Sequence, residues 1–161
     1  MLCAQCGKEH PVSEMELTFR RPDVVAALDR RELEARVQEN RNFCVMDGER
    51  FFVRVLLPLP VQGHEQSYCI GLWAEVDRPA FDRIYDLWET PDRGDEPPMN
   101  ARLANEVPFA EGSLGMNADL QMMGGDSRPC VYLRPSQNPL YGEQQSGIST
   151  HRAYEYTSYF A

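Results

Sequence analysis

The chain lacks a long apolar run, which excludes the simplest membrane and secretory assignments. Its longest apolar stretch, residues 55–61, contains two prolines, whereas a helix needs roughly 20 apolar residues to cross a bilayer. Polar and charged residues fill the N-terminus from Gln5 onward and leave no apolar segment of signal-peptide length. We therefore expect a soluble protein of the cytoplasm that has no membrane partner.

The motifs of common catalytic sites are also missing. The three histidines, His10, His64 and His151, stand without the neighbouring residues that a catalytic triad requires. There is no Gly-X-Ser-X-Gly elbow, no His-Glu-X-X-His and no phosphate-binding Gly-X-X-X-X-Gly-Lys loop. These absences favour a non-enzymatic role and leave open only an enzyme of unrecognised type.

Basic residues are scarce relative to acidic ones. The chain has 16 Lys and Arg against 25 Asp and Glu, for a net charge of −9. Such a surplus of negative charge disfavours nucleic acid and anionic lipid as partners. It would accelerate encounter with a protein whose surface is basic, because opposite charges attract over a distance. The plainer alternative is that the charge only keeps the protein soluble.

The length and the cysteine count set the remaining limits. With 161 residues, 42% of them apolar, the chain suits one domain over residues 1–161 with a core that needs no disulfides. Five cysteines without a secretory signal indicate reduced thiols, as is usual in the cytoplasm.

The only motif with recognisable chemistry lies in the first ten residues. Cys3, Cys6 and His10 form a Cys-X-X-Cys-Gly knuckle with a histidine four residues later. Two thiolates and one imidazole at this spacing can bind one tetrahedral structural zinc. The alternatives are a metal-free loop with reduced thiols and, less favoured, a redox pair, because redox Cys-X-X-Cys sites follow a strand and open a helix.

Local patterns predict a fold in which strands gather in the middle of the chain. We expect strands at residues 15–19, 43–46, 50–57, 67–76, 99–107, 116–122 and 130–133. We expect helices from Asp23, at 29–39, from Pro79, at 139–145 and from Ser149 to Phe160. The class is α+β, with a mainly antiparallel central sheet, helices at both ends and one inserted helix. Residues 1–14 form the knuckle packed on this domain.

Three further patterns refine this prediction. Asp47-Gly48 is a hairpin signal, and prolines 58 and 60 are expected to end the second strand. In the inserted helix, Phe81, Ile84, Tyr85 and Trp88 recur at helical spacing and predict one buried stripe. The tail aromatics are too closely spaced to share one helix face, so some of them must be exposed and available to a second copy of the chain: Tyr154, Tyr156, Tyr159 and Phe160.

An acidic, proline-rich loop over residues 89–98 is the first candidate binding surface. It carries Glu89, Asp92, Asp95 and Glu96 against a single Arg93. The simplest interpretation is a solvated connection. The functional one is a docking surface for a basic partner, whose prolines lower the entropy lost on binding.

Arg54 is the second candidate, because it lies between Phe52 and Leu56 on one face of a strand, where a charge needs a partner. An internal ion pair, for example with Glu143, or simple exposure would satisfy it. Arg54 would also suit an anchor for a ligand carboxylate or phosphate, since guanidinium groups bind these oxyanions in a bidentate manner.

Fragments spread over nearly the whole chain resemble one bacterial family, the domain of unknown function 2199. They are Cys3-X-X-Cys6-Gly7-X-X-His10, Phe43-Cys44-Val45-Met46-Asp47, Phe51-Phe52-Val53-Arg54, Gly71-Leu72-Trp73, Phe81, Trp88, Asp95-Glu96-Pro97-Pro98, Leu103-X-Asn105, Arg128-Pro129, Pro139-Leu140 and Glu143-Gln144-X-X-Gly147-Ile148. The resemblance implies no established activity. It nominates Cys44, from the shared hairpin, as the fourth ligand of the zinc site.

The chain departs from the family pattern at three places. It has Asn100-Ala101 where the family usually has Gly-Trp, and Gln137-Asn138 where the family usually has Asp-His. It also lacks the histidine that the family tends to carry within residues 116–122. If the family's chemistry needs those histidines, this member lacks that chemistry, which again favours a non-enzymatic role.

Together these observations favour an acidic binding module that recognises a protein with a basic surface. Its most concrete form is an immunity-type inhibitor of a basic toxin. A small enzyme with Arg54 and Glu143 in one cleft, and a structural subunit of a homo-oligomer, are the alternatives.

Overall fold

The computed structural model describes residues 16–125 and 127–160, and within them the predicted elements can be compared directly. The helices are α1 (Asp23–Ala26), α2 (Arg30–Arg36), α3 (Arg78–Leu87), the 3-10 turn η1 (Arg93–Asp95), α4 (Pro139–Ser146) and α5 (Thr150–Thr157). The strands are β1 (Val37–Glu39), β2 (Phe43–Met46), β3 (Arg50–Leu59), β4 (Tyr68–Val76), β5 (Met99–Leu103), β6 (Asn117–Gln121) and β7 (Cys130–Leu133).

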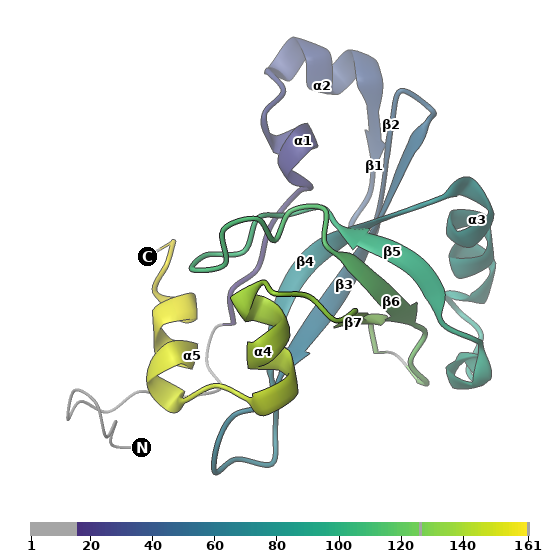
Figure 1. Ribbon diagram of the computed structural model, residues 1–161. Coiled ribbons are helices and arrows are strands. Elements are labelled where there is room, and N and C mark those ends of the chain that lie inside the picture. The colour runs from purple at the N-terminus through teal and green to yellow at the C-terminus, as the bar shows by residue number, and fades with distance from the viewer. Residues whose placement is uncertain (1–15, 126, 161) are drawn as a thin grey trace.

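The described strands form one sheet that closes on itself. They follow each other in sequence order, each pairing with the next in antiparallel fashion, and β7 returns to pair with β3 in parallel. The result is a barrel of β3 to β7 from which the β1–β2 ribbon extends toward α1 and α2 (Figure 1). The predicted α+β class and mainly antiparallel sheet are confirmed.

Alternation along the barrel strands separates an apolar interior from an outer face. Val53, Val55 and Leu57 of β3 and Ile70 and Leu72 of β4 are fully buried in the main core. The helices α4 and α5 lie side by side at one flank of the barrel and α3 lies at another (Figure 1). A second cluster forms on the outer face beneath α1, from Val25, Cys44, Met46, Phe52, Trp73 and Ala104.

A buried glutamine completes the barrel where β3 meets β7. The parallel register pairs Leu56 with Cys130, so the next donor on β3 would be Pro58, which has no N–H. The amide of Gln144 occupies this seam: its Nε2 donates to the carbonyls of Pro58 (3.2 Å) and Val131 (3.1 Å). Its Oε1 accepts from the N–H of Leu133 at 2.7 Å. A side chain of α4 thus replaces the peptide contacts that proline removes.

This seam explains one error in the sequence prediction. Pro58 was expected to end its strand, yet β3 continues to Leu59. The Gln144 amide donates to the carbonyls of Pro58 and Val131, so no carbonyl is left unpaired on that side of the strand despite the proline. Two further expectations change. Val37 begins β1 instead of continuing α2. Of the expected strand at residues 15–19, the structure describes 16–19, and among these only Thr18 forms a bridge, with Gly71.

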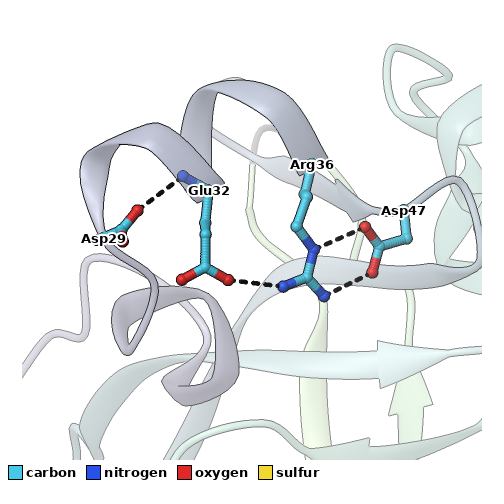
Figure 2. A network of polar contacts seen from close by, with 4 residues as sticks. All are labelled: Asp29, Glu32, Arg36 and Asp47. Carbon is cyan, nitrogen blue, oxygen red and sulfur yellow. Dashed lines mark hydrogen bonds and ion pairs between the residues drawn. The ribbon is translucent and has the colours of Figure 1, made fainter.

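A polar network fixes α2 to the β2–β3 hairpin (Figure 2). Asp29 caps the helix by accepting from the Glu32 N–H at 2.8 Å. At the other end, Arg36 donates twice to Asp47, at 2.9 and 2.8 Å, and once to Glu32 at 3.0 Å. Asp47 occupies the hairpin turn with φ 56°, so this ion pair holds the turn against the helix end.

Candidate functional site

A cavity of about 410 Å³ lies between the end of α3 and the turn that joins β1 to β2. Three aromatic rings form one side of it: the centroid of the Phe43 ring lies 5.2 Å from that of Tyr85 and 4.8 Å from that of Trp88. The remaining lining residues are polar: Asn40, Arg41, Asn42, Asp86 and Glu89. An aromatic surface with carboxylates beside it is suited to an organic cation, because both features attract positive charge.

Tyr85 is more exposed than its helical spacing predicts. Ile84 is fully buried, but the Tyr85 side chain is 60% exposed. Phe81 and Trp88 are partly buried against the core. The predicted buried stripe is therefore wrong for Tyr85, which instead contributes to the cavity.

The acidic loop after α3 is held in place by its single arginine. Arg93 is only 4% exposed, and its guanidinium donates to the carbonyls of Trp88, Met123 and Ser127. It also lies 5.6 Å from the Trp88 ring centroid. These contacts attach the loop to the segment after β6, so the loop is a formed surface and not a loose connection.

The four predicted loop carboxylates have different surroundings. Glu96 forms a bidentate ion pair with Arg83, at 2.8 and 3.0 Å, and hydrogen bonding to that guanidinium lowers the pKa of Glu96. Glu89, Asp92 and Asp95 are exposed and form no ion pair with any residue that the structure describes. The structure thus places Glu89 at the cavity, extends the negative surface through Asp92 and Asp95, and leaves Glu96 neutralised.

Arg54 lies on the outer face of the barrel, where its side chain alternates with the buried residues of β3. Its Nη1 donates to the Arg41 carbonyl at 3.2 Å, and its guanidinium carbon is 5.9 Å from the Trp73 ring centroid. Burial lowers the pKa of Arg54, and so do the charges of Arg128 and Arg41.

Glu143 belongs to a different part of the molecule. Its carboxylate accepts from the Tyr156 hydroxyl and pairs with Arg152 at 3.3 Å. Tyr156 is part of the main core, whereas Arg54 alternates with the core residues Val53 and Val55 and so faces outward. The structure does not bring Arg54 and Glu143 into one cleft.

The predicted zinc site lies mostly outside the described residues. Cys3, Cys6 and His10 lie outside residues 16–125 and 127–160, so this prediction is not tested for them. Cys44 is fully buried between β2 neighbours in the second apolar cluster, where burial raises the pKa of its thiol to about 12. Among residues 16–125 and 127–160, no group of three His, Cys, Asp or Glu side chains is placed to hold a metal.

The C-terminal aromatics divide as their spacing predicts. Tyr156 is fully buried, while Tyr154, Tyr159 and Phe160 are 42%, 52% and 63% exposed. Tyr159 contacts both Phe160 and Phe109 edge to face, at 5.0 and 5.8 Å. The exposed rings thus pack partly on each other.

Two buried polar residues that matter for the site were not identified from the sequence. Arg93 was counted only as a weak counter-charge in the loop, and Asn105 only as part of a motif. Asn105 is fully buried; it accepts from the Trp73 N–H and donates to the Arg21 carbonyl and to Asp23, each at 2.8 Å. Asn105 is detectable in part as a polar residue directly after the apolar end of a strand, whereas Arg93 stands among loop residues that give no such signal.

The comparisons with known proteins give the family alone. The family described as "Uncharacterized protein conserved in bacteria (DUF2199)" matches residues 2–148. The chain belongs to this family, as the sequence fragments indicated. No curated protein matches the chain, and no solved structure does. No helix within the described residues is long and apolar enough to cross a membrane.

Proposed function

We propose that this protein is a non-enzymatic cytoplasmic binding module that recognises a protein with a basic surface. The observation that carries the proposal is the aromatic cavity of Phe43, Tyr85 and Trp88, with Asp86 and Glu89 in its lining. A lysine or arginine side chain entering there would meet aromatic rings and two carboxylates together.

The adjoining loop extends this surface. Asp92 and Asp95 continue the negative charge beyond the cavity, and the buried Arg93 guanidinium keeps the backbone between them in place. A preformed surface loses less entropy on binding than a flexible one. One cation in the cavity and others along the loop would give a partner both an anchor and electrostatic steering.

Arg41 is the one cationic residue in the lining of this cavity. Its backbone carbonyl accepts a hydrogen bond from Arg54 at 3.2 Å, so this residue also adjoins a second, basic group of residues. An immunity-type inhibitor that masks the basic site of a toxin is the most specific form of the proposal.

The test compares two triple variants that remove the same total charge. Glu89→Gln, Asp92→Asn and Asp95→Asn together neutralise the proposed surface. Glu49→Gln, Glu65→Gln and Glu111→Gln together neutralise exposed carboxylates elsewhere. With an arginine-rich decapeptide as the probe, calorimetry should show at least ten-fold weaker binding for the first variant and a change below two-fold for the second. Equal losses would mean that net charge alone drives binding and would refute a defined site.

A further inference from the structure

On the opposite side of the β1–β2 turn lies a second cavity, of about 320 Å³. Its lining is mainly positive, whereas the chain as a whole is negative. It is lined by Arg20, Arg21, Glu39, Asn40, Arg41, Arg54 and Trp73. Arg21 forms a bidentate pair with Glu39, with contacts of 2.8 and 3.1 Å, so these two charges offset each other. Arg20, Arg41 and Arg54 remain without a carboxylate partner among the described residues.

Arg54 is held at this cavity by its backbone and its side chain. Its N–H donates to the Asn42 carbonyl at 2.9 Å, and its Nη1 donates to the Arg41 carbonyl. Asn40 stiffens the same turn, since its Oδ1 accepts from the N–H groups of Asn42 and Phe43, both at 2.9 Å. The guanidinium is therefore positioned before any ligand arrives.

The arrangement is costly without an anion. The Nε of Arg54 is buried and has no hydrogen-bond partner, and a buried donor left unsatisfied is destabilising. Arg41 and Arg128 add like charge, and both disfavour the charged form of Arg54. Elsewhere in the described chain most arginines pair with carboxylates, as Arg36, Arg50 and Arg83 do. A cluster of uncompensated guanidinium groups in a chain of net charge −9 thus marks a place where negative charge is supplied from outside.

We infer that this cavity binds a phosphate group, free or carried by a small ester, between Arg54, Arg41 and Arg20. A phosphate ester carries about 1.5 to 2 negative charges at neutral pH, and free phosphate also carries more than one, which suits three uncompensated arginines better than a singly charged carboxylate. Guanidinium groups also match the geometry of phosphate oxygens through paired N–H donors. The site adjoins the acidic cavity and shares Asn40 and Arg41 with it, but Arg20 and Arg54 line the basic cavity alone. The inference is argued from these arginines and does not rest on the proposed function.

The experiment measures binding of small anions to the full chain at constant ionic strength. Inorganic phosphate, phenyl phosphate and acetate are titrated into the wild type, Arg54→Met, Arg41→Met and a control, Arg31→Met, which alters an exposed arginine of α2. Phosphate should bind more tightly than acetate. Loss of either site arginine should weaken phosphate binding by about ten- to a hundred-fold, because hydrogen bonds to charged groups are strong, and Arg31→Met should change it less than two-fold.

Each outcome decides a point. Tighter binding of phenyl phosphate than of inorganic phosphate assigns the site to an ester, and equal or weaker binding assigns it to free phosphate. Arg41 is exposed on the turn, so Arg41→Met keeps the test valid if Arg54→Met fails to fold. Acetate binding as tight as phosphate, no phosphate binding at millimolar concentration, or equal effects of Arg41→Met and Arg31→Met would overturn the inference.

Discussion

Replacing Gln144 by methionine should destabilise the protein far more than any other single change in α4 that preserves side-chain volume. The substitution removes the amide and leaves three buried backbone groups without their partners: the carbonyls of Pro58 and Val131 and the N–H of Leu133. An unsatisfied buried group costs about 1–3 kcal/mol. With some relaxation of the seam, we expect a total loss of about 3–5 kcal/mol in the free energy of unfolding.

That loss is a large part of the stability of a typical domain, which is about 5–15 kcal/mol. The measurement is urea unfolding followed by far-ultraviolet circular dichroism, with the neighbouring exposed residue changed in the control Gln145→Met. Hydrogen exchange supplies the local readout: the Leu133 amide should exchange faster in Gln144→Met than in the control. A difference below about 0.5 kcal/mol between the two variants, the usual range for surface changes, would refute the view that this amide closes the barrel.

Two further predictions concern metal content and acid stability. Protein purified without added metal or a histidine tag should contain about one zinc per chain if Cys3, Cys6 and His10 bind it. Cys6→Ser should lose that zinc, while Cys69→Ser, which changes a half-buried cysteine of β4, should keep it. A metal-free wild type would remove the zinc hypothesis. The second prediction rests on Glu106, whose pKa is lowered by hydrogen bonds from the N–H groups of Leu114 and Gly112. The Glu106 carboxylate binds a proton more readily in the unfolded chain than in the folded one. Its contribution to the free energy of unfolding is therefore present above the unfolded pKa of Glu106. That contribution is lost as the pH falls through the folded pKa, mainly below about pH 5. Glu106→Gln should therefore flatten the acid limb of the stability curve; an acid limb as steep as that of the wild type would contradict this.

Local sequence patterns predicted most elements because turn signals bound them closely. The strand at residues 43–46 ends at Asp47-Gly48, and β2 has these same limits. Ser149 was expected to cap the last helix, and it accepts from the Arg152 N–H at 3.1 Å. Such features depend on a few neighbouring residues, so a single sequence is enough to find them.

What could not be predicted depends on contacts between distant parts of the chain. Pro58 stays within its strand only because Gln144, 86 residues later, supplies the missing contacts. Arg93 looks like an exposed loop charge, but it donates to the Trp88 carbonyl and to two carbonyls of the β6–β7 connection, at least 30 residues away. No local pattern places these groups together, and they become visible only when the barrel closes.

The candidate sites divide in the same way. Acidic composition identified Glu89 and its loop, because clustered charge is visible in the sequence itself. The aromatic cavity beside it was not predicted, since the helical spacing of Tyr85 indicated burial and the structure leaves this ring exposed. Arg54 was identified as unusual, yet its surroundings of Arg20, Arg41 and Arg128 come from three other segments of the chain.

The two tryptophans allow the most direct test of the central claim that a basic partner binds at the acidic cavity. Trp88 lines that cavity, whereas Trp73 is buried at 2% exposure with its indole N–H bonded to the Phe19 carbonyl at 3.2 Å. Titration of the arginine-rich decapeptide, followed by the NMR signals of both indole N–H groups, should shift the Trp88 signal and leave that of Trp73 in place. Binding that leaves the Trp88 signal unmoved, or that shifts Trp73 instead, would contradict the account.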